Sequence, residues 1–147
     1  MQIDRHKGSN TVDTDTNGTH GSLVHGDITN SIISAAYRVH SRLGPGLLER
    51  VYKACLAHEL TRAGVTFVSE KLLPVEYDGL IIELGYRIDL LVADVVIVEL
   101  KALEKILPVH EAQLLAYLRL GKKRVGLLIN FNVAELKDGI RRKISGF

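Results

Sequence analysis

The amino-acid sequence predicts an α/β fold in which a mixed central β-sheet is flanked by α-helices. Two observations favour this class: apolar residues recur at helical spacing after Asp27, and several apolar runs of strand length follow in the middle of the chain. A helix, a strand and a short helix are then predicted, an order typical of a sheet covered by helices. With 147 residues the chain is most simply one domain that can bury a sizeable core.

The first part of the chain has a different composition from the rest. Residues 1–26 are rich in Thr, Asp, Asn, Gly, Ser and His, and they contain few large apolar side chains. Such a segment cannot bury enough surface to offset the entropy lost on ordering, so we expect a flexible polar leader. The folded domain is expected over residues 27–147, and Asp27 is the predicted N-cap of its first helix.

Glycine and proline mark the boundaries of the predicted elements. Gly44-Pro45-Gly46 breaks the first helix, Asp78-Gly79 is a hairpin signal, and Pro108 suits the first residue of a helix that Gly121 would close. In chain order we predict helices at 27–43 and 47–60, strands at 66–72, 74–77 and 80–84, two strands that meet at 93–94, a helix at 108–121, a strand at 125–131 and a short helix at 134–143.

Composition excludes several classes of protein. The net charge of +2 indicates no global attraction to polyanions, so a nucleic-acid site would depend on local patches. Cys55 is the one cysteine, which excludes an internal disulfide and a four-cysteine zinc or iron–sulfur site. No apolar run has the length of a membrane span and no signal pattern is present, so we expect a cytoplasmic protein. Kinase, protease and dehydrogenase motifs are also missing.

The most informative stretch runs from Asp89 to Lys101. Two apolar runs meet at Ala93-Asp94, a polar break that suits a tight turn, so an antiparallel strand pair is predicted. Because side chains alternate along a strand, Glu99 and Lys101 should emerge on one side. Charges that emerge from a buried run are costly unless they are paired or bound to a cation. Two carboxylates beside an ammonium group therefore indicate a divalent metal next to a phosphate, although such residues also occur at ordinary strand ends.

Two helical motifs accompany this stretch. Gly46 precedes Glu49 and Tyr52, which are three residues apart at the start of a helix and so share a face. A glycine at a helix N-terminus allows close backbone approach to an anionic group, but a first-turn glutamate and a packed tyrosine are equally ordinary. Gln113 and Tyr117 lie at i and i+4 of the later helix, where both can donate to phosphate oxygens, or can simply be polar residues on a helix surface.

Histidine and basic residues provide weaker signals. His40 lies late in the first predicted helix and is either a satisfied histidine or a metal ligand. Two basic clusters are either phosphate contacts or ordinary solvated charge. The clusters consist of Lys122, Lys123 and Arg124 before the last strand, and of Arg141, Arg142 and Lys143 in the tail.

Together these motifs resemble the PD-(D/E)XK nuclease superfamily, and more closely the small prokaryotic GxxExxY family named after its Gly-x-x-Glu-x-x-Tyr motif. The helix motif at Glu49, then Asp89, then Glu99-x-Lys101, then Gln113 with its tyrosine, occur in the family's order. The last pair also resembles that of RecB- and Cas4-like nucleases, although the iron–sulfur cysteines are missing. Ile88 stands where the superfamily motif has proline. The resemblance covers residues 27–147 and implies a restriction-endonuclease-like core.

The resemblance also implies a role for each matching position. Asp89 and Glu99, with the backbone carbonyl of Leu100, would ligate Mg²⁺ or Mn²⁺. Lys101 would orient the attacking water, and Glu49 would complete the acidic cluster. The remaining implied roles are metal binding for His40 and substrate positioning for Gln113 and Tyr117. Apart from the resemblance, we predict nucleic-acid contact for Tyr52, Lys122, Lys123, Arg124, Arg141 and Arg142.

The leading hypothesis is a metal-dependent nuclease that acts on DNA, with RNA as a further substrate class. Carboxylate and carbonyl oxygens favour Mg²⁺ or Mn²⁺ over zinc, and a divalent cation supplies hydroxide and charge neutralisation for phosphodiester hydrolysis. One alternative is a nucleic-acid-binding or assembly module that retains the nuclease fold without useful catalysis. Another is a phosphoesterase for a small substrate. The sequence predicts no membrane partner and leaves a homo-oligomer or a protein partner open.

Overall fold

A computed structural model describes residues 23–146. The predicted polar leader therefore lies outside the described residues, except for its last four positions. Within the described range the element order is helix, helix, three strands, two further strands, helix, strand, a short 3-10 helix and a final strand. This order confirms the predicted mixed α/β class.

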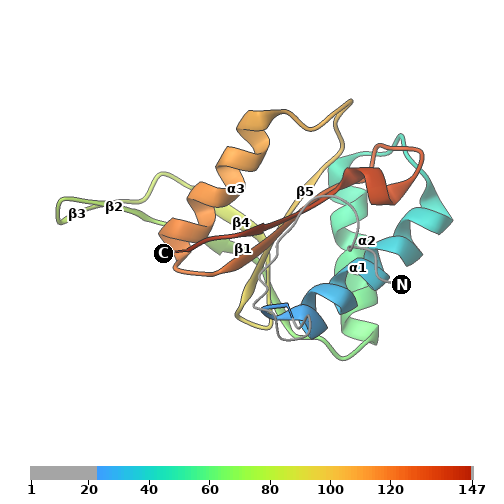
Figure 1. The fold of residues 1–147 in the computed structure, drawn as a ribbon, viewed down its shortest axis with the longest axis horizontal. Coiled ribbons are helices and arrows are strands. Elements are labelled where there is room, and N and C mark those ends of the chain that lie inside the picture. Colours follow the sequence, from blue (N-terminus) through green and yellow to red (C-terminus); the bar gives the residue numbers. More distant parts are fainter. Residues whose placement is uncertain (1–22, 147) are drawn as a thin grey trace.

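A five-stranded mixed sheet forms the centre of the molecule (Figure 1). β5 and β6 run parallel, and each of the other neighbouring pairs is antiparallel. The parallel pair requires a crossover between its strands, which here contains a helix. In their order across the sheet the strands are β1 (Phe67–Leu72), β4 (Arg87–Val92), β5 (Val96–Lys101), β6 (Val125–Asn130) and β7 (Ile140–Ile144).

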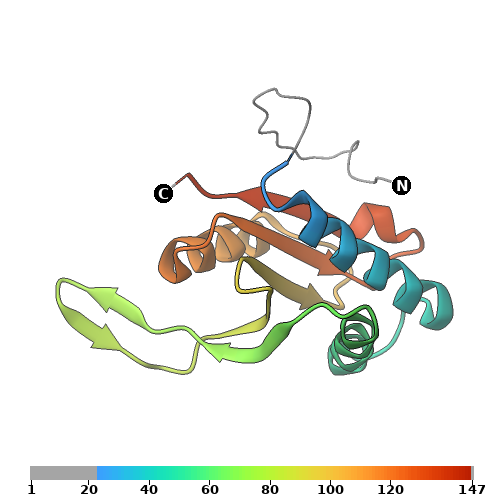
Figure 2. The ribbon, with the colours of Figure 1, turned by 90° about the horizontal axis from the view of Figure 1, so that it is seen from below.

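Helices cover both faces of this sheet. α1 (Gly26–Leu43) and α2 (Glu49–Arg62) pack on one face, and the crossover helix α3 (Pro108–Gly121) packs on the other (Figures 1 and 2). Successive residues of β5 divide between the two cores, because side chains of a strand alternate: Val96 and Val98 face α1 and α2, whereas Ile97 faces α3. The sheet is therefore buried on both sides, which explains the continuous apolar character of β5 and β6.

Some helix boundaries differ from the sequence-based expectation. α1 begins at Gly26, with His25 at the N-cap in a left-handed conformation, so Asp27 lies in the first turn and is not the N-cap. A carboxylate there still interacts favourably with the helix dipole. α2 begins at Glu49, two residues later than predicted. α3 begins at Pro108 as predicted, but Lys122 and not Gly121 adopts the left-handed conformation that ends it.

Two tight hairpins occur where the sequence predicts them. Ala93 and Asp94, between β4 and β5, both have positive φ angles, and so do Asp78 and Gly79. Two successive residues with positive φ are typical of the two-residue hairpin turn whose twist matches that of antiparallel strands. The second turn joins β2 (Val75–Tyr77) to β3 (Leu80–Ile82), which pair only with each other and extend away from the body of the domain (Figure 2).

The predicted helix at 134–143 is wrong. Residues Leu136–Gly139 form a single 3-10 turn, and the chain then continues as β7, which pairs antiparallel with β6. Ile140 and Ile144 are four residues apart and so fit a helical pattern, but pairing with the neighbouring strand determines the outcome. As a result Arg141 and Lys143 lie on one side of the sheet and Arg142 on the other.

Among the helices of residues 23–146, none combines the length and the apolar character that crossing a membrane requires.

Candidate active site

The centre of the candidate site is the point where β4 and β5 diverge. Their ladder of backbone pairs ends at Leu90 and Val98, and the next two opposed residues are Asp89 and Glu99. Side chains replace the missing backbone bonds there. The Asp89 N–H donates to Glu99 Oε2 at 3.0 Å, and the N–H of Leu100 donates to Asp89 Oδ2 at 2.8 Å. The structure thus brings both carboxylates into one gap between two strands.

The next residue on the same face of β5 is Lys101, which lies against α3. Its Nζ donates to Gln113 Oε1 at 3.4 Å. One turn further along α3, Tyr117 is buried, and loss of solvation, followed by the charge of Glu99, raises its pKa. The helix pair predicted at i and i+4 therefore lies beside the lysine and the two carboxylates.

Burial makes Glu99 costly to ionise. Glu99 is 5% exposed, and loss of solvation, followed by the charge of Asp89, raises its pKa to about 8. Glu49, in the first turn of α2, interacts electrostatically with Asp89 and Glu99. Partial burial and the charge of Asp89 raise the pKa of Glu49, while Lys101 and Lys53 act in the opposite direction. Negative charge is thus concentrated around Asp89, which favours a cation at this position.

The oxygen donors of this site suit a hard divalent cation. The side chains alone are too few to coordinate one, so a backbone carbonyl and water would have to complete the coordination. Among residues 23–146, no three His, Cys, Asp or Glu side chains are grouped so that they alone could hold a metal ion. Leu100 can add its carbonyl oxygen. Its N–H points to Asp89, and the N–H and C=O of one strand residue project to the same side. Two carboxylates, one carbonyl and several waters match the coordination that Mg²⁺ prefers.

The glycine–glutamate–tyrosine motif has a structural explanation. Tyr52 is fully buried and its ring stacks on Phe131 with centroids 4.7 Å apart. Its hydroxyl donates to the Gly44 carbonyl at 2.6 Å and accepts from the Leu47 N–H at 3.1 Å. Tyr52 therefore fixes the loop that positions Glu49. The implied contact of Tyr52 with nucleic acid is not supported, because its side chain is inaccessible.

His40 also has an internal role in this structure. It is buried, and its Nε2 lies 2.8 Å from the Val133 carbonyl oxygen. A carbonyl oxygen can only accept, so Nε2 carries the proton of this bond and is not free to ligate a metal. The histidine thus ties α1 to the loop after β6. With Nε2 protonated, only its Nδ1 could ligate a metal, and metal binding by His40 stays a prediction.

The first basic cluster lies at the opposite end of β5 from the acidic gap, whereas Arg141 of the second lies in the same cross-strand row as Glu99, two strands away. Lys122, Lys123 and Arg124 follow the far end of α3, where Lys123 Nζ donates to the backbone oxygen of Asp94 at 2.8 Å. Since Asp94 is in the turn before β5 and Glu99 is near the end of that strand, the strand separates them. In β7, Arg141 and Lys143 pair with Glu111 at 3.6 and 2.5 Å.

Arg142 is unsuited to nucleic-acid contact. It is buried, and its Nη2 donates to the backbone oxygen of Val24 at 2.5 Å. The side chain therefore packs inside the molecule beside the start of α1. The sequence-based assignment to a phosphate contact failed because the tail is a strand and not an exposed helix.

Two residues that support the site were not identified from the sequence. Asn130 ends β6 and is 1% exposed; its amide bonds to both the N–H and the carbonyl of Leu103, which fixes the segment after Lys101. Tyr86 packs edge-on against Tyr117, with ring centroids 6.1 Å apart, and remains partly exposed at the rim of the site. A polar residue at the end of an apolar run was the only sequence signal for Asn130.

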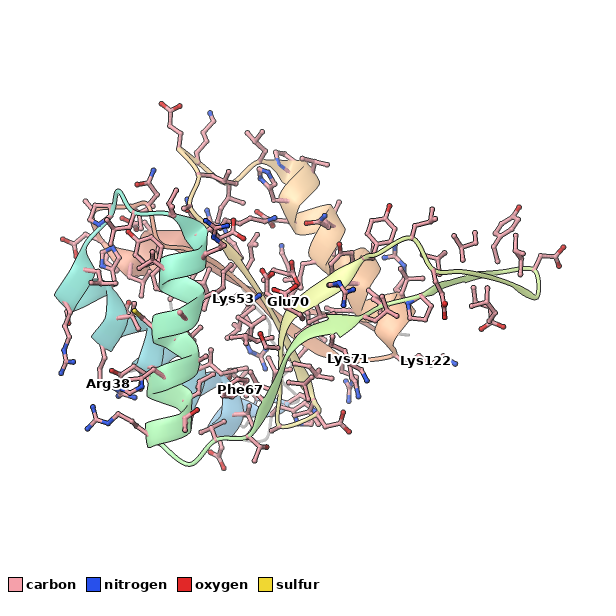
Figure 3. All side chains as sticks on the ribbon, turned by 180° about the vertical axis from the view of Figure 1, so that it is seen from behind. Arg38, Lys53, Phe67, Glu70, Lys71 and Lys122 are labelled. Atoms are coloured by element: carbon pink, nitrogen blue, oxygen red, sulfur yellow. The ribbon has the colours of Figure 1, made fainter. Side chains whose placement is uncertain are left out.

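A salt bridge fixes the position of α2 beside the sheet. Figure 3 shows Lys53 of α2 and Glu70 of β1 pointing toward one another, and the two side chains form an ion pair. Lys53 is one turn after Glu49 and contributes to the electrostatic balance of that carboxylate. The pair therefore connects the edge of the sheet to the helix that presents the third acidic residue.

A mixed sheet between helical layers, with an Asp and a Glu-x-Lys at the divergence of two central strands, defines the class of restriction-endonuclease-like domains. Residues 26–143 match the model of the PD-(D/E)XK nuclease superfamily, and the chain belongs to that superfamily. The comparison with curated proteins gives no match, and neither does the comparison with solved structures.

Proposed function

We propose that this protein is a metal-dependent nuclease of the GxxExxY type, which hydrolyses phosphodiester bonds of DNA at the gap between β4 and β5. The observation that supports this most strongly is the opposition of Asp89 and Glu99, with Lys101 following on the same face. A module that only binds polyanions would gain nothing from several carboxylates at one position, since they repel phosphate unless a cation neutralises them.

In this proposal the residues divide the chemistry between them. Asp89, Glu99 and the Leu100 carbonyl would hold Mg²⁺ or Mn²⁺, which when bound supplies a hydroxide at neutral pH and offsets charge on the phosphate. Lys101 would donate to the attacking water or to a phosphate oxygen, and the Gln113 amide orients the lysine. Glu49 interacts electrostatically with Asp89 and Lys101, and would add negative charge that favours the cation.

The test is cleavage of single- and double-stranded DNA and RNA by the full chain, with Mg²⁺, Mn²⁺ or EDTA. The variant Asp89→Asn preserves shape and removes the charge, and Asp94→Asn is its matched control, because Asp94 is exposed in the turn at the other end of β5. Metal-dependent cleavage by the wild type and the control, but not by Asp89→Asn, is expected.

The outcome also separates the alternatives. Cleavage that survives Asp89→Asn would overturn the proposed site. Salt-sensitive nucleic-acid binding without cleavage, unchanged in Asp89→Asn, would favour the binding module that retains the fold.

A further inference from the structure

Two tyrosine rings in contact lead from the acidic gap to the surface of the domain. Tyr117, on α3, is 8% exposed and lies within the electrostatic reach of Glu99 and Asp89. Tyr86 packs against it, with ring centroids 6.1 Å apart and ring planes inclined at 61°. Tyr86 itself is 48% exposed. The ring beside the gap is therefore buried, and the next ring presents aromatic surface to solvent.

Tyr86 is held by the sheet although it precedes the first residue of β4. Its carbonyl oxygen accepts a hydrogen bond from the N–H of Leu73 at 2.8 Å, directly beyond the outermost pair of β1 and β4, Leu72 with Arg87. Backbone pairing of the two strands thus continues by one residue to Tyr86. Because the backbone is fixed and the ring rests on Tyr117, a ligand that binds to this ring has little ordering entropy to offset.

The outer ring lies close enough to the gap to contact nucleotides beside a bound phosphate. Tyr86 is three residues before Asp89, and three residues of extended strand span about 10 Å. One strand of stacked DNA advances about 3.4 Å per nucleotide, so about three nucleotides cover the same distance. A nucleic-acid strand with one phosphate at Asp89 therefore has a neighbouring base within reach of the ring.

The chemistry of the ring suits a base and not a phosphate. The acidic side chains of the gap repel phosphate unless a cation neutralises them. A nucleobase is uncharged, and the face of any base can stack on an aromatic side chain. Tyr86 offers such a surface next to the acidic residues. The group of a nucleic acid that fits this position is therefore a base whose face is available for stacking.

We propose that Tyr86 stacks on an unpaired base next to the scissile phosphate and so selects single-stranded nucleic acid over intact duplex. This inference rests on the proposed nuclease function, because that function brings a phosphate to the gap. Bases in a duplex are paired and stacked on one another, so a base reaches the ring only at the cost of unstacking. A single strand offers its bases without that cost, and stacking on an aromatic ring tolerates any sequence.

The experiment compares three probes of equal length: single-stranded oligothymidylate, its duplex with oligodeoxyadenylate, and an abasic deoxyribose-phosphate strand. Binding is measured by fluorescence anisotropy with Mg²⁺ in the Lys101→Ala background, which keeps the carboxylates and lacks the lysine of the proposed chemistry. Tyr86→Leu should weaken binding of oligothymidylate at least about fivefold and leave binding of the abasic strand unchanged. Since phosphate contacts are retained, the dependence of affinity on salt should not change.

Two further variants separate stacking from packing. Tyr86→Phe keeps the ring and should restore the oligothymidylate binding that Tyr86→Leu loses. Tyr77→Leu is the matched control, because Tyr77 is a 71% exposed tyrosine in the hairpin of β2 and β3. If Tyr86→Leu weakens binding of the abasic strand as much as that of oligothymidylate, Tyr86 acts by supporting the fold and the stacking role is wrong. Unchanged binding of oligothymidylate would also overturn it.

A cleavage assay of the wild type separates this outcome from that of the proposed function. If the wild type cleaves DNA and Tyr86→Leu has no base-dependent effect, the nuclease function stands and the stacking role fails. If the wild type cleaves nothing and Tyr86→Leu still loses oligothymidylate binding selectively, the base site stands without catalysis. If none of the three probes binds, the stacking role is overturned together with the nucleic-acid substrate.

Discussion

Asp89 and Glu99 lie opposite one another on β4 and β5, where bonds from backbone N–H groups to the two carboxyl groups replace the backbone ladder. Each carboxylate accepts one hydrogen bond from a backbone amide of the opposite strand, at 3.0 Å for Glu99 and 2.8 Å for Asp89. The bonds fix two carboxyl groups where the strands separate. A sheet that continued its ladder through this point would leave no room for a cation.

Lys101→Ala is expected to reduce cleavage at least about 100-fold, because it removes the positive charge that stabilises the developing phosphate charge. Metal binding should be retained, because the carboxylates remain. The measurements are cleavage rate and Mn²⁺ affinity by calorimetry. Lys105→Ala is the matched control, since Lys105 is an exposed lysine in the connector that follows. Equal rates for wild type and Lys101→Ala would refute the assigned role.

The pKa of Glu99 predicts how the metal-free protein responds to pH. The value rises from 4.5 to about 8 on folding, so the folded state binds this proton more tightly. The contribution of Glu99 to the free energy of unfolding should therefore be greatest below about pH 4.5. It should be lost as the pH rises toward 8. Mg²⁺ should reverse the loss, because a cation favours the ionised form.

Glu99→Gln tests this linkage, since it cannot ionise. Its melting temperature in EDTA should exceed that of the wild type at pH 8, with a smaller difference at pH 5. Glu104→Gln is an exposed control that should follow the wild type. Parallel pH curves for Glu99→Gln and wild type would contradict the prediction.

Local sequence signals were sufficient for most of the fold. The break at Gly44-Pro45-Gly46, the turns at Asp78-Gly79 and Ala93-Asp94, and the proline that begins α3 each have a local physical cause, and each marks a boundary in the structure. β7 could not be predicted in this way. The five residues of β7 fit both the helical period and the strand period. Pairing with β6 decides between them, and no local pattern encodes that pairing.

The candidate site was only partly predictable for a related reason. Strand alternation and helical spacing correctly placed Glu99 and Lys101, then Gln113 and Tyr117, on shared faces. Burial was not evident from the sequence. Tyr52 matches a motif that suggested a substrate contact, yet it packs inside the domain and acts through a loop. The spacing of residues predicts which side chains share a face of one helix or strand. Whether that face is accessible depends on all the elements packed around it.

Tyr52→Phe is expected to destabilise the protein by about 0.5–1.5 kcal/mol, because it removes the hydroxyl that bonds to the Gly44 carbonyl and the Leu47 N–H. Cleavage should also slow, since that loop positions Glu49. Urea denaturation and cleavage rate measure the two effects. Tyr77→Phe is the control, because Tyr77 is 71% exposed in the hairpin of β2 and β3. A variant with wild-type stability and rate would show that the hydroxyl does not hold the loop.

His40→Ala separates a structural histidine from a metal ligand. Loss of its bond to the Val133 carbonyl should cost about 1–3 kcal/mol, because a buried acceptor is left unpaired. Mn²⁺ affinity of the folded variant should equal that of the wild type. Calorimetric titration below the melting temperature gives this affinity, with the exposed His58→Ala as control. A tenfold loss of affinity in the folded His40→Ala protein would assign the histidine to the metal.

Gly139→Ala should damage the site from the far side of the sheet. A methyl group at this position would clash with the backbone oxygen of Asn130, so the two segments must separate. We expect a loss of at least about 2 kcal/mol, which is within the range for overpacking. Asn130 holds Leu103 through its side chain, so the displacement should also disturb the segment that follows Lys101 and slow cleavage.

Gly121→Ala is the matched control for this change. Its added methyl group would meet the nearest neighbour, a flexible leucine side chain, at 3.5 Å, an ordinary contact distance. Urea denaturation should therefore show little change for Gly121→Ala and a clear loss for Gly139→Ala. If Gly139→Ala lost stability but kept the wild-type cleavage rate, the connection from the 3-10 turn through Asn130 to Lys101 would be wrong, and the acidic gap would be held by β4, β5 and α3 alone.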